Sequence, residues 1–185
     1  MRRNAYTKLR IVGIEDGSFT KEDSKALLVA VLMQNGMWIE EIEIEEITID
    51  GLDATAAALK MLKKLTFDIV MLAGVSFAGF NLIDPTKLFK TFQKPVIIVS
   101  RSKPDNIAVK KALKEHFRDW HVRWNVFENL GPIYEFKPLR NEPPIYLEVV
   151  GAAAEQALNI VKLCCFSCRV PEPLRAARII ARGLS

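Results

Sequence analysis

The strongest constraint on the fold is a nearly continuous apolar run, Ala26–Met33, which is followed almost at once by the dipeptide Asn35-Gly36. An apolar run without alternation predicts a strand that is buried on both faces of a sheet. Asn-Gly is the strongest short signal for a tight hairpin, so we expect the chain to return as an antiparallel strand at Met37–Ile49. The isoleucines of that strand change parity at Glu45-Glu46, which predicts a β-bulge there that keeps all of them facing the core.

The rest of the chain divides into short elements. Lys8–Ile14 predicts a first strand, so the first fifty residues should form a three-stranded antiparallel meander. The pattern then predicts five helices and four further strands. The helices are expected at Ala54–Leu65, Asp84–Phe92, Pro104–His116, Ala152–Phe166 and Glu172–Arg182, buried strands at Phe67–Leu72 and Val96–Val99, and an extra hairpin or edge strands at Pro132–Phe136 and Ile145–Val149.

This order of elements restricts the topology, because short parallel crossovers are right-handed and each strand must find a neighbour. The simplest solution is the ribonuclease H-like fold, a mixed α/β sheet with helices on both faces. In that fold the first strand is central, between the second and the fourth. A doubly wound sheet would need a helix between the first two strands, and the pattern predicts none. We expect residues 1–185 to form one domain.

The sequence also bears on compartment. No apolar run reaches the roughly 18 residues of a membrane-spanning helix, and no hydrophobic segment follows the basic start Met1–Tyr6, so we expect neither a membrane anchor nor a signal peptide. Cys164, Cys165 and Cys168 then fit a reducing cytoplasm. We interpret them as structural, because no second pair of ligands accompanies them.

Charge distribution is more informative than the net charge of +4. Acidic residues concentrate in 15–53, whereas basic residues concentrate in 87–123 and 162–182. An acidic centre beside basic surfaces suits a metal-dependent enzyme that acts on phosphates, although ordinary solvated faces would give the same pattern. The glycine-spaced stretch 74–79 matches neither a P-loop nor a dinucleotide fingerprint, so we expect no dinucleotide cofactor.

On the expected fold, several carboxylates gather at one edge of the sheet. Glu15 and Asp16 end the first strand, Asp50 and Asp53 follow the third, and Ala73 ends the fourth strand beside the first. Converging carboxylates are the usual ligands of Mg²⁺ or Mn²⁺, and two such metals can activate a water against a phosphodiester. Structural interpretations stand beside this one: Asp53 as a helix N-cap, and Asp16 and Asp50 as turn residues before glycine.

Five segments in order carry a resemblance to a known family. They are Gly13–Gly17, Ile49–Thr55, Ala73–Asn81, Val99–Asp105 and Arg169–Arg175. The chain resembles a mainly archaeal family, long labelled a domain of unknown function, that is similar to endonuclease V and is called endonuclease dU-like. The resemblance implies a ribonuclease H-like fold and Mg²⁺-dependent cleavage of DNA near a deaminated base such as deoxyuridine.

The same resemblance assigns roles to residues. It implies that Glu15, Asp16 and Asp50 are metal ligands, with Asp53 completing the catalytic set. Ala73 stands where relatives carry an aspartate, so one metal ligand is missing and either activity is weakened or the chain is a pseudo-enzyme. Two basic residues that follow the next strand, Arg101 and Lys103, are expected to contact phosphate.

Two other hypotheses stay open on the sequence. One is a non-catalytic nucleic-acid-binding pseudo-nuclease of the same fold, which Ala73 favours. The other is an interaction protein that presents the edge of its acidic strand, Ile39–Ile49. Trp120 and Trp124 lie in a basic, aromatic stretch that suits either base stacking or a packed helix end. The sequence leaves open which base is recognised, whether the nucleic acid is DNA or RNA, and what the oligomeric state is.

Overall fold

The computed structural model describes residues 8–185, so the start of the chain, on which the expectation of no signal peptide rests, lies outside the described residues. A seven-stranded sheet has the order β3-β2-β1-β4-β7-β9-β8, and β5 and β6 form a separate hairpin. The strands are β1 (Arg10–Asp16), β2 (Lys25–Gln34), β3 (Trp38–Thr48), β4 (Ile69–Leu72), β5 (Ser76–Phe77), β6 (Asn81–Leu82), β7 (Val96–Ser100), β8 (Tyr134–Phe136) and β9 (Ile145–Val150). The helices are α1 (Ala54–Leu62), α2 (Pro85–Phe92), α3 (Asn106–His116), α4 (Trp120–Glu128), α5 (Ala154–Leu163) and α6 (Glu172–Leu184).

Strand β1 is central, as the order of elements predicted. It pairs antiparallel with β2 on one side and parallel with β4 on the other. The hairpin between β2 and β3 turns at Asn35 and Gly36, whose φ angles are 52° and 67°. Positive φ at both central residues is what a tight hairpin of matching twist requires. The predicted meander and the ribonuclease H-like arrangement of the sheet are therefore confirmed.

The predicted bulge at Glu45-Glu46 is wrong. Pairing between β2 and β3 runs without a shift there, and the irregularity lies near Leu32 and Met33 of β2, where β3 carries the extra residue. Ile47 is consequently buried, whereas Ile42 and Ile44 lie on the other face and are exposed. Glu43 and Glu45 lie on the same face as Ile47, where they form ion pairs with lysines of α1. The pairs are Lys60–Glu45 and Lys64–Glu43.

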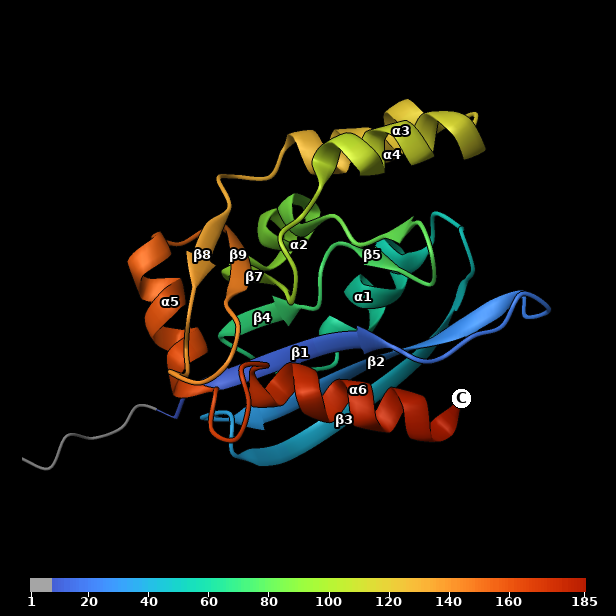
Figure 1. Cartoon of the computed structure of the whole chain (residues 1–185). Coiled ribbons are helices and arrows are strands. Elements are labelled where there is room, and N and C mark those ends of the chain that lie inside the picture. Colours follow the sequence, from blue (N-terminus) through green and yellow to red (C-terminus); the bar gives the residue numbers. More distant parts are fainter. Residues whose placement is uncertain (1–7) are drawn as a thin grey trace, which may run out of the picture.

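Helices cover both faces of the sheet (Figure 1). One core joins the sheet to α1 and α2 and reaches Leu113 of α3 and Phe127 of α4. The opposite face packs against α5 and α6. Helix α6 crosses β1 so closely that a Cβ at Gly13 would lie 2.2 Å from the carbonyl carbon of Pro173, so only glycine fits there. None of the described helices combines the length and apolar character needed to cross a membrane.

Local side-chain caps account for two helix starts, those of α2 and α3. Asp84 accepts hydrogen bonds from the backbone N–H groups of Thr86 and Lys87, and Pro85 occupies the first helical turn. Asp105 caps α3 in the same way. Helix α4 was not predicted, because its mixed polar and aromatic sequence has no helical period to detect.

Candidate functional site

The carboxyl ends of β1, β4 and β7 meet at one edge of the sheet and form a cavity of about 240 Å³. Glu15 enters it from β1, Arg101 from the segment after β7, and Arg178 from α6. Ala73 lines it from the end of β4, where its N–H donates to the carbonyl of Ile14 at 3.2 Å. The expected juxtaposition of Glu15 and Ala73 is therefore present. We call this cavity the Glu15 pocket.

The Glu15 carboxyl is held in an unusual electrostatic environment. Burial, and next the neighbouring charge of Asp16, raise the pKa of Glu15 from its ordinary 4.5 to about 8. Arg101 and Arg182 act in the opposite direction without cancelling the effect. Perturbed carboxyls in clefts are typical of functional sites, because enzymes tune acids by the same combination of burial and charge.

Asp16 belongs to the other face of the sheet. Successive residues of a strand point to opposite sides. Its Oδ2 accepts a hydrogen bond from the backbone N–H of Ala78, which belongs to the core on the α1 side, whereas Glu15 shares its pocket with α6. Burial raises the pKa of Asp16 against the lowering effect of that hydrogen bond. Glu15 and Asp16 thus lie at the end of the same strand, but their side chains are on opposite faces of the sheet.

Asp50 ties the turn after β3 to the β5–β6 hairpin. It adopts a positive φ of 56°, its Oδ1 accepts from the N–H of Phe80 at 2.7 Å, and its own N–H donates to Ala78 at 2.9 Å. A Cβ at Gly79 would lie 2.3 Å from the Asp50 Oδ1, so the hairpin needs glycine where the carboxylate approaches it. The side chain of Asp50 therefore already stabilises local structure.

Asp53 does not cap α1 with its side chain, contrary to expectation. Its carboxylate accepts from the N–H and Oγ1 of Thr48 and from the amide of Asn81. Burial alone would raise its pKa, but these hydrogen bonds outweigh burial and lower the pKa of Asp53. Asn81 supplies the cap in its place, because its Oδ1 accepts from the N–H of Ala54 at 2.9 Å. A cap brought by a distant loop leaves no local signal in the sequence.

Sequence reasoning also missed Arg123, which is only 4% exposed. Its guanidinium donates to three backbone carbonyls, of Asp50, Gly51 and Phe80, at 2.6–3.0 Å. It also pairs with Asp119, one turn earlier on the chain, at 3.1 Å. Arg123 thus fixes the turn that carries Asp50. Nothing marks it in the sequence, since the three carbonyls that it binds lie 43 to 73 residues upstream.

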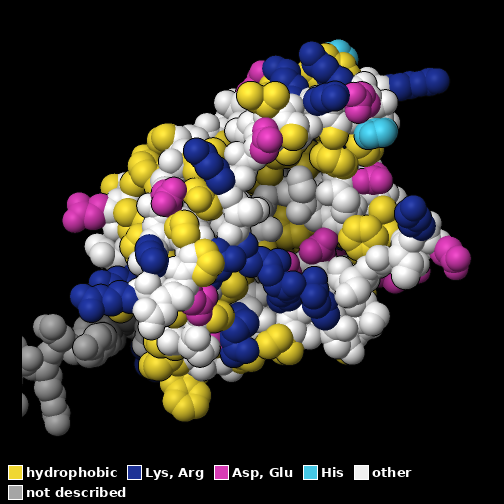
Figure 2. Space-filling view, in the orientation of Figure 1, with side chains coloured by type: hydrophobic (Ala, Val, Ile, Leu, Met, Phe, Trp, Pro, Cys, Tyr) yellow, Lys and Arg dark blue, Asp and Glu magenta, His cyan; other side chains and the backbone are white. Residues whose placement is uncertain are grey.

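Basic side chains border the Glu15 pocket. Arg175, Arg178 and Arg182 recur three and four residues apart on α6, which places them along one side of the helix. Figure 2 shows dark-blue side chains along α6 beside a hollow that separates this helix from the α3–α4 pair. Of the two expected phosphate contacts, Arg101 lines the pocket and Lys103 is exposed on the same segment. The backbone of that segment is held by Arg169, whose Nη1 donates to the Arg101 carbonyl at 2.8 Å.

The side chains around the Glu15 pocket do not provide a complete set of ligands for a divalent cation. Within residues 8–185, no three Asp, Glu, His or Cys side chains are placed to hold one metal ion. Glu15 and Asp16 lie on opposite faces, Asp50 and Asp53 accept hydrogen bonds from neighbouring groups, and Ala73 offers no oxygen. Hard cations prefer several oxygen ligands, so these residues do not fit a complete Mg²⁺ site.

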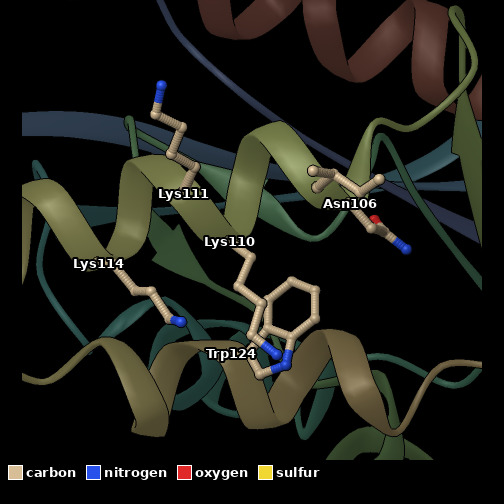
Figure 3. A pocket seen from close by; sticks show the side chains of 6 residues that line it. Asn106, Lys110, Lys111, Lys114 and Trp124 are labelled. Atoms are coloured by element: carbon tan, nitrogen blue, oxygen red, sulfur yellow. The ribbon is translucent and has the colours of Figure 1, made fainter.

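The basic, aromatic stretch serves to pack α4 against α3. Figure 3 shows Lys110 of α3 reaching toward Trp124 of α4. The Nζ of Lys114, one turn further along α3, lies 4.8 Å from the centre of the Trp120 ring. The Lys110 Nζ lies 4.5 Å from the centre of the Trp124 ring and 3.7 Å from a carboxylate oxygen of Glu128, to which the Trp124 indole N–H also donates. These contacts satisfy the charges and the indole within the helix pair. They favour the interpretation as a packed helical element.

The cysteines are free thiols. Cys164 and Cys165 are buried, and burial, as the largest cause, raises the pKa of each to about 12. Thiols of this kind are poor nucleophiles and poor metal ligands.

Comparison with solved structures defines the class. The chain superposes on endonuclease V of Ciona intestinalis, solved with inosine-containing DNA, with a TM-score of 0.65, 15% identity, and coverage of 96% of this chain and 85% of that one. A protein of unknown function from Archaeoglobus fulgidus superposes with a TM-score of 0.85, 28% identity, and coverage of 96% and 98%. The fold is that of the endonuclease V-like, ribonuclease H-like proteins.

Sequence comparison gives the family. The profile of the Endonuclease dU family matches residues 7–185, and the chain belongs to this family. It is similar to the UPF0215 protein of Methanothermobacter thermautotrophicus, with 34% identity over 188 residues covering 99% of this chain and 91% of the relative. A UPF0215 protein of Pyrococcus furiosus is 34% identical over 190 residues, covering 100% and 96%. The resemblance inferred from the five segments is thereby confirmed.

Proposed function

We propose that this protein is a DNA-binding member of the endonuclease V-like class that acts near deaminated bases such as deoxyuridine, with weakened metal-dependent strand cleavage. The observation that carries the proposal is the Glu15 pocket. It places a half-buried carboxyl at the joined ends of β1, β4 and β7, and brings Arg101 and Arg178 to the same cavity. A phosphodiester entering there meets guanidinium groups, which bind phosphate through paired N–H donors.

Weak cleavage follows from Ala73. It lies beside Glu15, and a methyl group adds no ligand oxygen to the pocket. Losing a residue that only supports a ligand lowers metal affinity or activity by about 10- to 100-fold, so a missing ligand should cost at least as much. Ala73→Asp should therefore tighten Mn²⁺ binding and raise cleavage. The pocket is open enough for the new carboxylate to stay solvated, since Arg101 and Ser102 on its border are exposed.

The second candidate is a pseudo-nuclease that binds nucleic acid without cutting it. The separation of Glu15 and Asp16 onto opposite faces favours this candidate, as does the use of Asp50 and Asp53 in hydrogen bonds to neighbouring groups. The edge-strand hypothesis has narrower support, namely that β3 lies at one edge of the seven-stranded sheet.

One experiment separates these candidates. Wild-type protein, Ala73→Asp and Glu15→Gln are incubated with Mg²⁺ or Mn²⁺ and duplexes that carry uracil, hypoxanthine or no lesion, and nicking is read on a gel. Calorimetric titration of each variant with Mn²⁺ and DNA binding in a chelator are measured in parallel. Weak nicking that increases in Ala73→Asp and vanishes in Glu15→Gln supports the first candidate. DNA binding without nicking by any variant supports the pseudo-nuclease, and no binding removes both.

A further inference from the structure

Strand β3 forms one edge of the seven-stranded sheet. It is 11 residues long, and over residues 39–47 its outer side has no backbone partner within the described part of the chain, residues 8–185. Proteins ordinarily protect such an edge with a short strand, a proline or lysines, because a row of free N–H and C=O groups pairs readily with another chain. Strand β3 contains neither proline nor lysine, and beyond its bulge the pairing with β2 is regular from Glu41 to Thr48.

The glutamates of β3 do little to keep another chain away, because the protein itself neutralises most of them. Four of the five form ion pairs with basic side chains of β1, β2 and α1. The pairs are Arg10–Glu40, Lys25–Glu46, Lys60–Glu45 and Lys64–Glu43. The surface of this strand is therefore close to neutral, so a molecule that carries the same surface is repelled only weakly.

One face of β3 carries an exposed apolar row. Ile39, Ile42 and Ile44 lie on the same face of the sheet as α6, because their partners in β2 belong to the core beneath that helix. Helix α6 packs on β1 and β2, and the three isoleucines are 50%, 44% and 41% exposed. We call these three residues the isoleucine stripe. Met37 and Trp38 extend the apolar surface at the hairpin end of β3, and yellow side chains appear at this lower edge of the molecule in Figure 2.

The size of this surface suits a second copy of the chain. Taking about 200 Å² for each fully exposed residue of this size, the stripe together with Met37 and Trp38 exposes roughly 500–600 Å². This area is at the upper end for one apolar patch on a monomer. With the strand backbone and its polar rim added, it approaches the roughly 800 Å² that each partner buries in a stable interface.

We propose that two copies of this chain associate through β3, with the two strands antiparallel and the isoleucine stripes side by side. Antiparallel pairing of a strand with its own copy is symmetric about a twofold axis, which is the commonest symmetry of soluble oligomers. The pairing satisfies the free backbone groups of the edge, and each stripe shields the other from water. The inference goes beyond the proposed function and does not rest on it.

The dimer leaves the candidate site accessible. The Glu15 pocket lies at the ends of β1, β4 and β7, whereas β3 is separated from β1 by β2. Arg178 lines the pocket from α6, while Ala176 and Ile180 of the same helix pack on the β2 core on the side of the stripe. Two chains joined at β3 therefore present two open Glu15 pockets.

Sedimentation equilibrium over about 1–100 µM protein, in chelator and without DNA, tests the proposal. Wild-type protein should show a reversible change from the mass of one chain to twice that mass. Ile42→Lys should raise the dissociation constant of the dimer by at least about tenfold, because a twofold interface carries the substitution twice and would bury both charges. Ile107→Lys is the matched control: it makes the same change at a residue of α3 that is 85% exposed, and it should leave the dissociation constant unchanged.

Two further measurements keep the result independent of one variant. Ile44→Lys should weaken the dimer as Ile42→Lys does, and urea denaturation checks that both variants are folded. Hydrogen exchange of the wild-type protein needs no substitution. The amide groups on the outer side of β3 should exchange more slowly above the dissociation constant than below it, because pairing protects them only in the dimer.

Three results would overturn the proposal. One is a wild-type protein that stays monomeric over the whole range, since the stripe would then serve a partner of another kind. Another is a dimer that both Ile42→Lys and Ile44→Lys leave intact, because the contact would then lie on a different face. The third is exchange in β3 that does not depend on protein concentration. None of these measurements requires DNA, so the dimer and the proposed function can fail separately.

Discussion

Replacing Arg123 by methionine isolates what the guanidinium contributes to the turn that carries Asp50. Methionine keeps much of the apolar stem. It removes every donor and also the guanidinium carbon, which lies 4.2 Å from the centre of the Phe117 ring. Three carbonyls lose their charged partner, and Asp119 loses its ion pair. Hydrogen bonds to a charged group contribute about 1.5–3 kcal/mol each. Their simple sum overestimates the loss, because the carbonyls lie near the surface and regain water.

We therefore expect Arg123→Met to lower the free energy of unfolding by about 3–5 kcal/mol, which is the loss of three hydrogen bonds to a charged group after partial replacement by water. The ion pair adds little, because the Asp119 side chain is 35% exposed. For a chain of this size that corresponds to a fall in Tm of roughly 6–20 °C. Arg123→Lys should recover little, since one ammonium cannot reach three carbonyls from the positions of a planar fork.

Urea unfolding followed by tryptophan fluorescence measures the change, and Arg118→Met is the matched control, because Arg118 is exposed on the segment just before α4. Hydrogen exchange adds a local measurement: the Phe80 N–H, which donates to Asp50, should exchange faster in Arg123→Met. A loss below about 1 kcal/mol, or one equal to that of Arg118→Met, would refute the reasoning that Arg123 fixes this turn.

Three other predictions concern the pocket and its support. In chelator, Glu15→Gln should stabilise the protein by about 2–3 kcal/mol more at pH 8 than at pH 5, after a discount for the solvent that reaches the carboxyl. Burial raises the pKa of Glu15 to about 8, so the folded wild-type protein holds this carboxyl protonated and loses stability as pH rises from about 4.5 through 8. Urea unfolding at both pH values measures the effect, and equal gains at pH 5 and pH 8 would contradict it. Arg101→Ala with Lys103→Ala should lower the slope of log affinity against log salt by roughly 0.7–0.9 per lost phosphate contact, measured by anisotropy. Gly13→Ala should cost about 1–3 kcal/mol in the same unfolding assay, because its Cβ would overlap the Pro173 backbone.

The sheet could be predicted because its signals are local. Buried runs such as Ala26–Met33 and the turn at Asn35-Gly36 depend on a few adjacent residues, and chain connectivity then leaves few topologies. The position of the β3 bulge could not be predicted in the same way. A bulge at Glu45-Glu46 would have let all the isoleucines face inward, but the extra residue of β3 lies near Leu32 and Met33 instead. Glu43 and Glu45 therefore share the face of Ile47 and pair with lysines of α1, an arrangement that exists only in the folded protein.

The candidate site shows the same division between local and distant causes. The neighbourhood of Glu15 and Ala73 follows from strand order, and the pocket contains both. The environments of Asp50 and Asp53 do not follow from it, because their partners come from the β5–β6 hairpin and from Arg123. The sequence can therefore nominate Asp50 and Asp53 as metal ligands, but it cannot show that their oxygens accept hydrogen bonds from Phe80 and Asn81 in the folded chain.

The balance of charge in the Glu15 pocket bears on what it can bind without a metal. In a two-metal site, carboxylates outnumber cationic side chains, and a bare phosphate is repelled until the ions arrive. Here Ala73 contributes no charge, and burial raises the pKa of Glu15 to about 8, which favours its protonated form at neutral pH. Arg101 and Arg178 remain charged, so the pocket is net positive. An anionic strand can then occupy it in the absence of any cation, which makes binding separable from cleavage. On the function proposed above, this separability would let the protein bind DNA while its cutting activity is weak.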